Sequence, residues 1–190
     1  MSDIDSKLVA EAIAAPPGDL RAFDELVRRH QGKVQTNCRY LSGNVEDSLD
    51  LAQEVLVKAY FNLKNFESRA QFGTWLNRIK VNHCLNHLRR QKGKSFVDVE
   101  EPALEGQAEL RSQWTADAGA EQGEARRRIG DTLDRMTESL RIPLILRDMD
   151  GLSYQEIADE LGIGLSAVKM RIKRAREEFR AIYQTEPARD

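Results

Sequence analysis

The C-terminal part of the chain decides the fold, where residues 153–182 read SYQEIADELGIGLSAVKMRIKRAREEFRAI. Ser153 followed three positions later by Glu156 is a capping box, in which each side chain bonds the amide of the other residue. A helix is therefore predicted to begin at Tyr154. Gly162 interrupts the apolar pattern of this short helix, and glycine tolerates the positive φ of a tight turn. A longer helical pattern follows, and this order is that of a helix-turn-helix.

The longer helix is predicted to have an apolar face and a cationic face. The residues expected to pack inward recur every three or four positions: Leu165, Val168, Ile172, Ala175, Phe179 and Ile182. The opposite side is predicted to carry Lys169, Lys173, Arg176 and Arg180, with Met170 and Arg174 beside them. A helical hairpin with a merely solvated charged face is the alternative. The helix-turn-helix spacing of Ala158, Gly162 and Val168 favours a second helix that enters the major groove of DNA.

The distribution of charge matters more than its sum. The chain has 190 residues and a net charge of −2, which alone argues against a nucleic-acid-binding protein. Residues 69–97, however, hold seven Lys or Arg and no acid, whereas residues 98–124 hold eight acids and one arginine. A basic surface is therefore expected to precede a flexible acidic linker.

No apolar run has the length of a membrane span and the N-terminal residues do not resemble a secretion signal, so we expect a cytoplasmic protein.

Apolar periodicity predicts helices on both sides of this linker. They are expected near residues 8–13, 20–41, 45–63, 74–91, 125–136 and 138–149, with Pro143 tolerated only in the first turn of the last one. Residues 65–73 are predicted to form a loop that exposes two aromatic side chains. We expect an all-α fold of two small helical domains, residues 1–96 and 125–190, joined by a flexible acidic linker, residues 97–124.

The cysteines and histidines are predicted to be structural. Cys38 and Cys84 fall on apolar helical stripes, which favours reduced core thiols over a disulfide, and His30 is expected in the core or at its boundary. His83 and His87 have the spacing of metal ligands, but lysine and arginine share their face and no carboxylate is near in sequence. Neither a metal nor a cofactor is therefore predicted.

Two further helices are predicted to present polar surfaces. On the helix at 45–63, the side opposite the apolar stripe carries Asp50, Gln53, Glu54 and Val57. Composition alone favours the interpretation that this side is solvated surface. The helix at 74–91 is expected to display Arg78, Lys80, Asn82, Asn86, Arg89 and Arg90. Cations interleaved with amides, next to a loop with aromatics, suit contacts to a phosphate backbone and stacking on unpaired bases.

Taken in order, these motifs resemble a group 4, or extracytoplasmic-function, sigma factor of bacterial RNA polymerase. The stretches that carry the resemblance are DLAQE at 50–54 with KAY at 58–60, residues 66–72, TWLNRI at 74–79 with Asn82, DGLSYQEIA at 150–158 and RARE at 174–177. The resemblance covers nearly the whole chain. It implies a two-domain subunit that lends promoter specificity to the polymerase and catalyses no reaction itself.

The resemblance also implies partners and sites. The expected partners are core RNA polymerase, promoter DNA and an anti-sigma factor, with the free protein a monomer. The polymerase would bind at Asp50, Gln53 and Glu54. A flipped base and the rest of the minus-ten element would be bound by Phe66, Ser68, Arg69, Phe72, Arg78, Lys80, Asn82 and Asn86. The minus-thirty-five element would be read by Ser166, Lys169, Met170, Arg171, Lys173, Arg174 and Arg176.

Two other classes of protein remain as alternatives. A conventional helix-turn-helix regulator would bind operator DNA as a dimer without polymerase, yet no dimerisation heptad or effector domain is evident. An enzyme acting on nucleic acid would need a metal or nucleophile constellation, and the sequence offers none.

Overall fold

The computed structural model describes residues 3–67, 70–92 and 120–185. Within these ranges the chain forms helices and no strand, which confirms the predicted all-α class. The helices fall into two compact units, residues 1–88 and residues 89–190. Most of the predicted acidic linker lies outside the described ranges, as do Ser68 and Arg69. In the described part of the chain, no helix combines the length and apolar character needed to cross a membrane.

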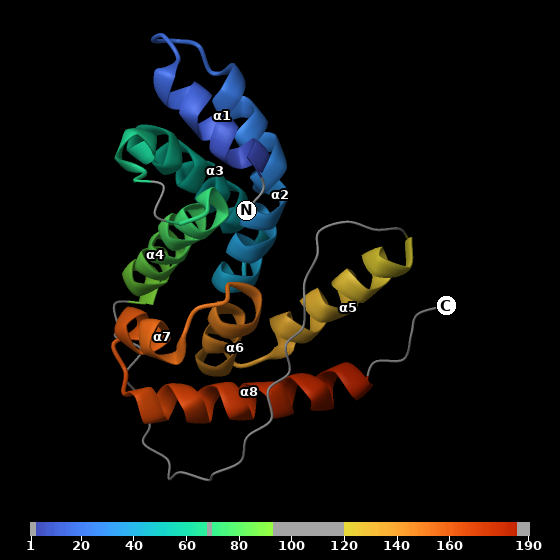
Figure 1. The fold of residues 1–190 in the computed structure, drawn as a ribbon. Helices are drawn as coiled ribbons and strands as arrows, with labels where there is room; N and C mark the ends of the chain where they lie inside the picture. The colour runs from blue at the N-terminus through green and yellow to red at the C-terminus, as the bar shows by residue number, and fades with distance from the viewer. Residues whose placement is uncertain (1–2, 68–69, 93–119, 186–190) are drawn as a thin grey trace. The chain divides into compact units, whose positions relative to one another are not determined.

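The first unit is built on two long helices joined by a tight turn. Helix α2 (Arg21–Ser42) ends at Gly43, whose φ of 69° suits glycine and whose N–H donates to Arg39 O. Asn44 then caps α3 (Val45–Asn62), its side-chain oxygen accepting from Glu46 N at 2.9 Å. Helix α3 packs along α2, and α1 (Asp3–Ala14) packs against α2 as well, as Figure 1 shows. The short 3₁₀ helix η1 (Leu63–Asn65) and α4 (Phe72–Lys92) complete this unit.

The core of the first unit joins α2, α3 and α4. Its fully buried members include Leu26, Leu41, Val55, Ala59 and Leu85. Cys38 of α2 and Cys84 of α4 are free, buried thiols whose Sγ atoms are 3.5 Å apart, so the predicted reduced core cysteines are confirmed. His30 is partly buried against Phe72, which confirms its place at the core boundary.

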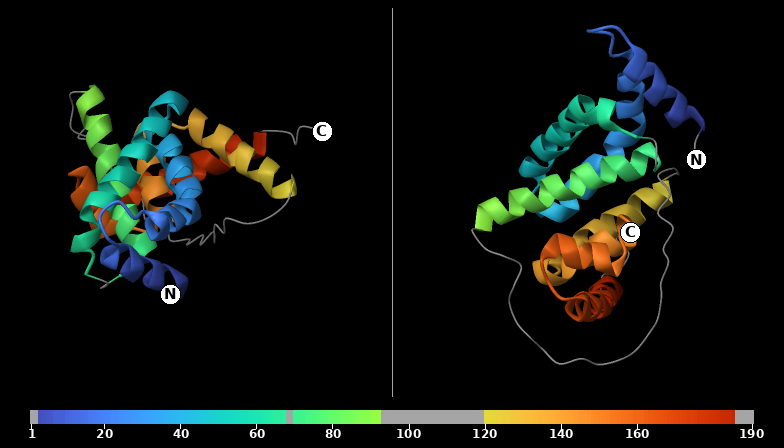
Figure 2. Two further views of the ribbon diagram at one scale, coloured as in Figure 1. Left: turned by 90° about the horizontal axis from the view of Figure 1, so that it is seen from above. Right: turned by 60° about the vertical axis from the view of Figure 1, so that its left-hand side comes forward.

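The second unit consists of three shorter helical segments packed on one long helix. They are α5 (Ala120–Arg135), α6 (Glu138–Leu144) with the π-helical segment η2 (Ile145–Met149), and α7 (Tyr154–Leu161). Helix α8 (Leu165–Thr185) runs across all of them in Figure 1, and the right-hand view of Figure 2 looks nearly along its axis. Helix α5 begins at Ala120, inside the range expected to be linker, so the predicted start at residue 125 is wrong.

The position of Pro143 also differs from the prediction. Thr137 is the N-cap residue of α6, so Pro143 lies in the second turn rather than the first. A proline there removes one backbone N–H and crowds the preceding turn, which disturbs α-helical hydrogen bonding. The helix continues through the wider η2 turn, in which Asp150 N donates to Ile145 O at 3.0 Å. Ile142, Ile145 and Leu146 nevertheless remain fully buried.

Candidate DNA and polymerase interfaces

The helix-turn-helix forms as its sequence predicts. Ser153 Oγ accepts from Glu156 N at 3.2 Å, and Ser153 N donates to Glu156 Oε2 at 2.8 Å, so both halves of the capping box are present. Gly162 ends α7 with a φ of 67°, and its N–H donates to Ala158 O. Val168, Ile172 and Ala175 are buried on the inner face of α8. These contacts fix the direction in which α8 leaves the turn.

Most residues predicted to read the minus-thirty-five element lie on the outer side of α8. Ser166, Lys169 and Arg174 are exposed, and Met170, Arg171 and Lys173 are partly exposed. The first three turns of α8 therefore present two lysines and two arginines that duplex DNA can reach. Their individual roles remain predictions.

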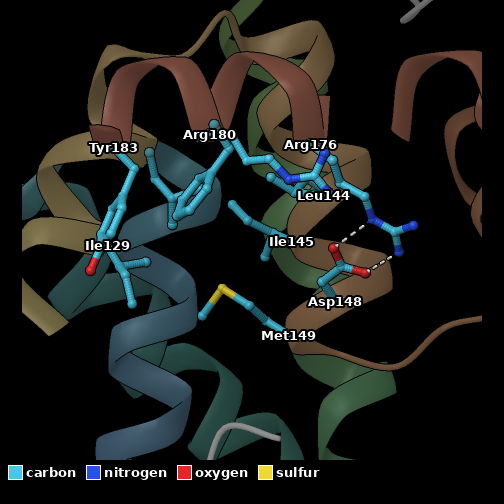
Figure 3. Close-up of a pocket in the computed structure, with 10 residues that line it drawn as sticks. Ile129, Leu144, Ile145, Asp148, Met149, Arg176, Arg180 and Tyr183 are labelled. Atoms are coloured by element: carbon cyan, nitrogen blue, oxygen red, sulfur yellow. Dashed lines mark hydrogen bonds and ion pairs between the residues drawn. The ribbon is translucent and has the colours of Figure 1, made fainter. Parts of the chain in front are cut away.

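Arg176 is an exception, because the expectation that it shares the outer cationic face is wrong. Its side chain is only 15% exposed, and Nη2 lies 2.7 Å from Asp148 Oδ1 while Nε donates to Oδ2 at 3.1 Å. Figure 3 shows this pair at one end of a groove of about 260 Å³ between α5, η2 and α8. Arg176 is four residues after buried Ile172, so helical geometry turns it inward. The carboxylate raises the pKa of Arg176.

Apart from Arg180, the rest of this groove is lined by apolar and aromatic side chains. They are Ile129 and Leu133 of α5, Leu144, Ile145 and Met149 from α6 and η2, and Phe179 and Tyr183 of α8. The rings of Phe179 and Tyr183 stack with centroids 5.7 Å apart, and the guanidinium of Arg128 lies 4.3 Å from the Tyr183 ring centre. The C-terminal half of α8 therefore packs through its aromatic side chains, while Arg180 remains exposed.

Helix α4 presents a narrower polar stripe than expected. Arg78, Asn82, Asn86 and Arg90 recur at intervals of four residues and are exposed along one side. Lys80 is 1% exposed, so the prediction that it lies on the displayed surface is wrong. It is four residues after Leu76 and four before Cys84, both buried, and so shares their inner face. Residues 78, 82 and 86 are thus the members of the predicted minus-ten set on α4 that DNA can reach.

The two aromatics predicted to be exposed in the loop belong to a packed cluster, defined here as His30, Phe66, Phe72 and Trp75. Phe72 is 5% exposed and starts α4, rather than preceding it. Its ring centre lies 6.2 Å from that of Phe66, 5.6 Å from Trp75 and 5.2 Å from His30. The expectation of an exposed Phe72 is therefore wrong, whereas Phe66 is partly exposed. Contacts within the cluster hold Phe66 and Phe72, the two ends of the loop predicted to capture a base, close to each other.

The outer side of α3 carries more than the predicted polar residues. Asp50, Gln53 and Glu54 are exposed there, as expected. Leu49, Val57 and Phe61 are also exposed, Phe61 by 74%. Leu49, Gln53, Val57 and Phe61 are spaced four residues apart and follow one stripe along the helix. The sequence analysis does not include Leu49 and Phe61 in this face, although their four-residue spacing outside the core stripe indicates it. The face therefore combines apolar contact area with two acids.

Two histidines of α4 face two carboxylates of α3. His83 Nε2 lies 2.7 Å from Glu54 Oε2, and His87 Nε2 lies 3.6 Å from Asp47 Oδ2. Burial and nearby Lys58 lower the pKa of His83, while Glu54 opposes this shift. Sequence proximity had suggested no carboxylate near these histidines, and the fold supplies one for each. The described residues nevertheless contain no group of three or more His, Cys, Asp or Glu arranged to hold a metal ion.

Comparison with known proteins assigns the chain to a family. A model of sigma-70 region 2 matches residues 26–94, and a model of sigma-70, region 4 matches residues 126–179. The chain is 37% identical over 166 residues to the ECF RNA polymerase sigma-E factor of Escherichia coli K12, with 84% of this chain and 85% of that protein aligned. It is 32% identical over 168 residues to the ECF RNA polymerase sigma factor SigW of Bacillus subtilis, with 86% and 89% aligned.

A solved structure supports the same assignment. The structure of CnrH in complex with the cytosolic domain of CnrY matches with a TM-score of 0.57 and 26% identity, covering 97% of this chain and 100% of that one. The relatives, the two regional matches and the helix-turn-helix of the second unit agree with one another. The chain belongs to the ECF, or group 4, sigma factors of bacterial RNA polymerase.

Proposed function

We propose that this sigma factor binds core RNA polymerase through α3, recognises the minus-ten element with α4 and the preceding loop, and reads the minus-thirty-five element with α8. In this division of labour the polymerase performs the chemistry, and the sigma factor supplies promoter selection and assists melting. The protein would act in the cytoplasm, where the polymerase and the promoter are.

The outer face of α3 is the single observation that carries the proposal. It exposes Leu49, Val57 and Phe61 beside Asp50, Gln53 and Glu54. A monomeric protein rarely exposes such a stripe unless another protein covers it, and charged residues around an apolar centre are typical of an interface. A regulator that works without polymerase has no need of this second protein-binding face.

The DNA-binding part of the proposal is supported by exposure and charge. Arg78, Asn82 and Asn86 form one accessible stripe of α4, and Lys169 and Arg174 are accessible on α8. Lysine and arginine neutralise phosphates and fix the register of a protein on DNA, while amides and arginines bond base edges. Phe66 is the accessible aromatic of the loop and would stack on an unpaired base.

We further propose that an anti-sigma factor holds the protein inactive. CnrH, a relative of known structure, was solved in complex with the cytosolic domain of CnrY. A partner that covers the α3 face would exclude the polymerase by direct competition. Co-purification of the tagged chain from its native cell, with and without added core polymerase, tests whether a bound protein is displaced.

Reconstituted transcription tests the main proposal. The double variant Asp50→Ala/Gln53→Ala and the single variant Phe61→Ser should lose core polymerase in a pull-down while keeping the wild-type melting temperature, because all three side chains are exposed. Arg28→Ala, which removes an exposed cation of α2 paired with Glu25, is the matched control and should bind normally. Retention of polymerase by both test variants would reject the α3 assignment.

The operator-binding alternative has a separate test. Footprinting of the purified chain on its target DNA, with and without core polymerase, distinguishes the two functions. The proposal requires protection of both promoter elements only when polymerase is present.

A further inference from the structure

An acidic residue of helix α1 contacts two neighbouring residues of α2. Asp5 Oδ1 accepts from Arg29 Nε at 2.7 Å, and Asp5 Oδ2 lies 3.1 Å from His30 Nε2. The side chains of Asp5 and His30 are both mostly buried, so this contact differs from a solvated surface pair. The match to sigma-70 region 2 begins at residue 26, which leaves α1 and Asp5 outside it.

The ring of His30 also contacts the start of α4. Its ring meets that of Phe72 edge-on, with centroids 5.2 Å apart and an angle of 65°. The ring also lies close to Gly73, since a Cβ atom placed there would be 3.5 Å from His30 Cε1. The imidazole is therefore held between a carboxylate of α1 and the first turn of α4.

The first turn of α4 is one of the two ends of the predicted base-capturing loop. Gln71 O accepts from Thr74 N at 3.0 Å and from Trp75 N at 3.1 Å, which fixes where the helix starts. Phe66, at the other end, lies 5.2 Å from Trp75 and 6.2 Å from Phe72 between ring centres. Within the aromatic cluster, His30 is the member that also contacts α1 through its ring nitrogen.

We propose that Asp5 and His30 are positioning residues for the minus-ten loop. Asp5 fixes the imidazole of His30, His30 fixes Phe72, and Phe72 with Trp75 sets the place of Phe66, which meets the unpaired base. The inference rests on the proposed function of this loop. Neither Asp5 nor His30 touches DNA, and α1 gains a role in promoter opening that lies outside the matched region.

The contacts also show why α1 acts on this site and not on the polymerase face. His30 and Phe72 belong to α2 and α4, whereas the polymerase residues Gln53 and Glu54 are exposed on α3. Loss of the Asp5 contact would free the His30 ring to turn, and the first turn of α4 would lose a fixed neighbour. A general loss of stability would instead weaken polymerase binding and DNA binding together.

The test uses the reconstituted holoenzyme and a promoter selected by the wild-type holoenzyme from a randomised library. Opening is followed with 2-aminopurine placed in the minus-ten element. Asp5→Ala and His30→Leu should each reduce the equilibrium constant for opening about fivefold to tenfold, the size expected for one charge-assisted contact. Affinity for core polymerase should remain within twofold of wild type, as a rough limit for surfaces that are not coupled.

Two variants serve as matched controls. Arg29→Ala removes the guanidinium that donates to Asp5 Oδ1 and leaves the His30 contact at Asp5 Oδ2, and Glu11→Gln removes an exposed contact of α1 with Lys7. Both should open the promoter normally. His30→Gln, whose amide can still donate to Asp5, should recover most of the opening that His30→Leu loses.

A spectroscopic readout follows the cluster itself. In a Trp114→Phe background, which leaves Trp75 as the chain's sole tryptophan, Asp5→Ala should increase quenching of the Trp75 emission by acrylamide, whereas Arg29→Ala should not.

The outcomes separate the inference from the proposed function. If the wild-type holoenzyme selects no promoter, the proposed function fails. If it selects one and Asp5→Ala and His30→Leu open it as wild type does, the positioning inference is wrong. It is also wrong if opening, polymerase affinity and melting temperature fall together.

Discussion

Arg176 of α8 and Asp148 of η2 form a two-point ion pair, with nitrogen–oxygen distances of 2.7 and 3.1 Å. The pair joins the recognition helix to the π-helical segment across 28 positions of sequence. An arginine that lies in a cationic run is therefore a structural residue, and the surface of α8 proposed to read DNA is confined to its first half.

Arg176→Ala should destabilise the protein rather than weaken DNA recognition directly. Loss of a partly buried, charge-assisted pair is expected to lower the free energy of unfolding by about 1–2 kcal/mol. Urea denaturation of the full chain measures this loss. Arg180→Ala, an exposed change one turn later, is the control and should leave stability unchanged. Normal stability of Arg176→Ala together with weaker promoter binding would restore Arg176 to the DNA-binding set.

Ser153→Ala should also lower stability, by about 1 kcal/mol, because it removes the side-chain half of the capping box at the start of α7. Thermal denaturation compares it with Ser166→Ala, an exposed serine in the first turn of α8. Alanine is the better helix former there, so this control should not be destabilised. Equal melting temperatures for the two variants would mean that the cap contributes nothing measurable.

Lys169→Ala should weaken minus-thirty-five binding without changing the melting temperature, since its side chain is exposed on α8. A base contact would cost about 1–3 kcal/mol and relax one position, whereas a phosphate contact would reduce affinity evenly and lower the salt dependence. Holoenzyme affinities over a panel of point-substituted promoters distinguish these cases. Lys64→Ala, an exposed change in η1, is the control. Unchanged affinity and selectivity for Lys169→Ala would remove this residue from the interface.

His83 should make stability depend on pH. Burial, Lys58 and His87 lower its pKa in the folded protein, and Glu54 only partly opposes them. The unfolded state therefore binds the proton more tightly, so stability is unaffected above the unfolded pKa and falls as pH drops below it. The melting temperature of the wild type should therefore fall as pH drops below about 6.5, the ordinary pKa of histidine, and His83→Gln should reduce this fall. Identical pH profiles for wild type and His83→Gln would contradict the prediction.

Local signals made most of the fold predictable from sequence. Ser153, Glu156 and Gly162 act within a few residues of one another, and the structure has each of them in its predicted role. Contacts between segments that are distant in sequence were harder to predict. The partner of Arg176 is 28 positions away and that of His83 is on another helix, so a list of charges in one helix cannot reveal either.

The errors within helices have a related cause. Lys80 and Phe72 were expected on the surface because lysine is usually exposed and Phe72 was assigned to a loop. In the structure both lie on the inner side of α4, whose apolar face is wide enough to include them. The residues predicted for the polymerase face, by contrast, lie opposite a clean apolar stripe, so that helical geometry alone was sufficient to place them.

The wide turn at Ile145–Met149 has the geometrical effect of one residue inserted into a helix. Asp150 N donates to Ile145 O, five residues back, where an α-helix would use Leu146. One residue corresponds to about 100° of rotation about the helix axis. Deleting a single residue from η2 would thus turn the Asp148 side chain away from Arg176. If that ion pair were kept, the deletion would instead change the direction in which the chain reaches Ser153, the N-cap of α7. The rotation of the chain about the helix axis in η2 accordingly determines the direction in which the following helix-turn-helix begins.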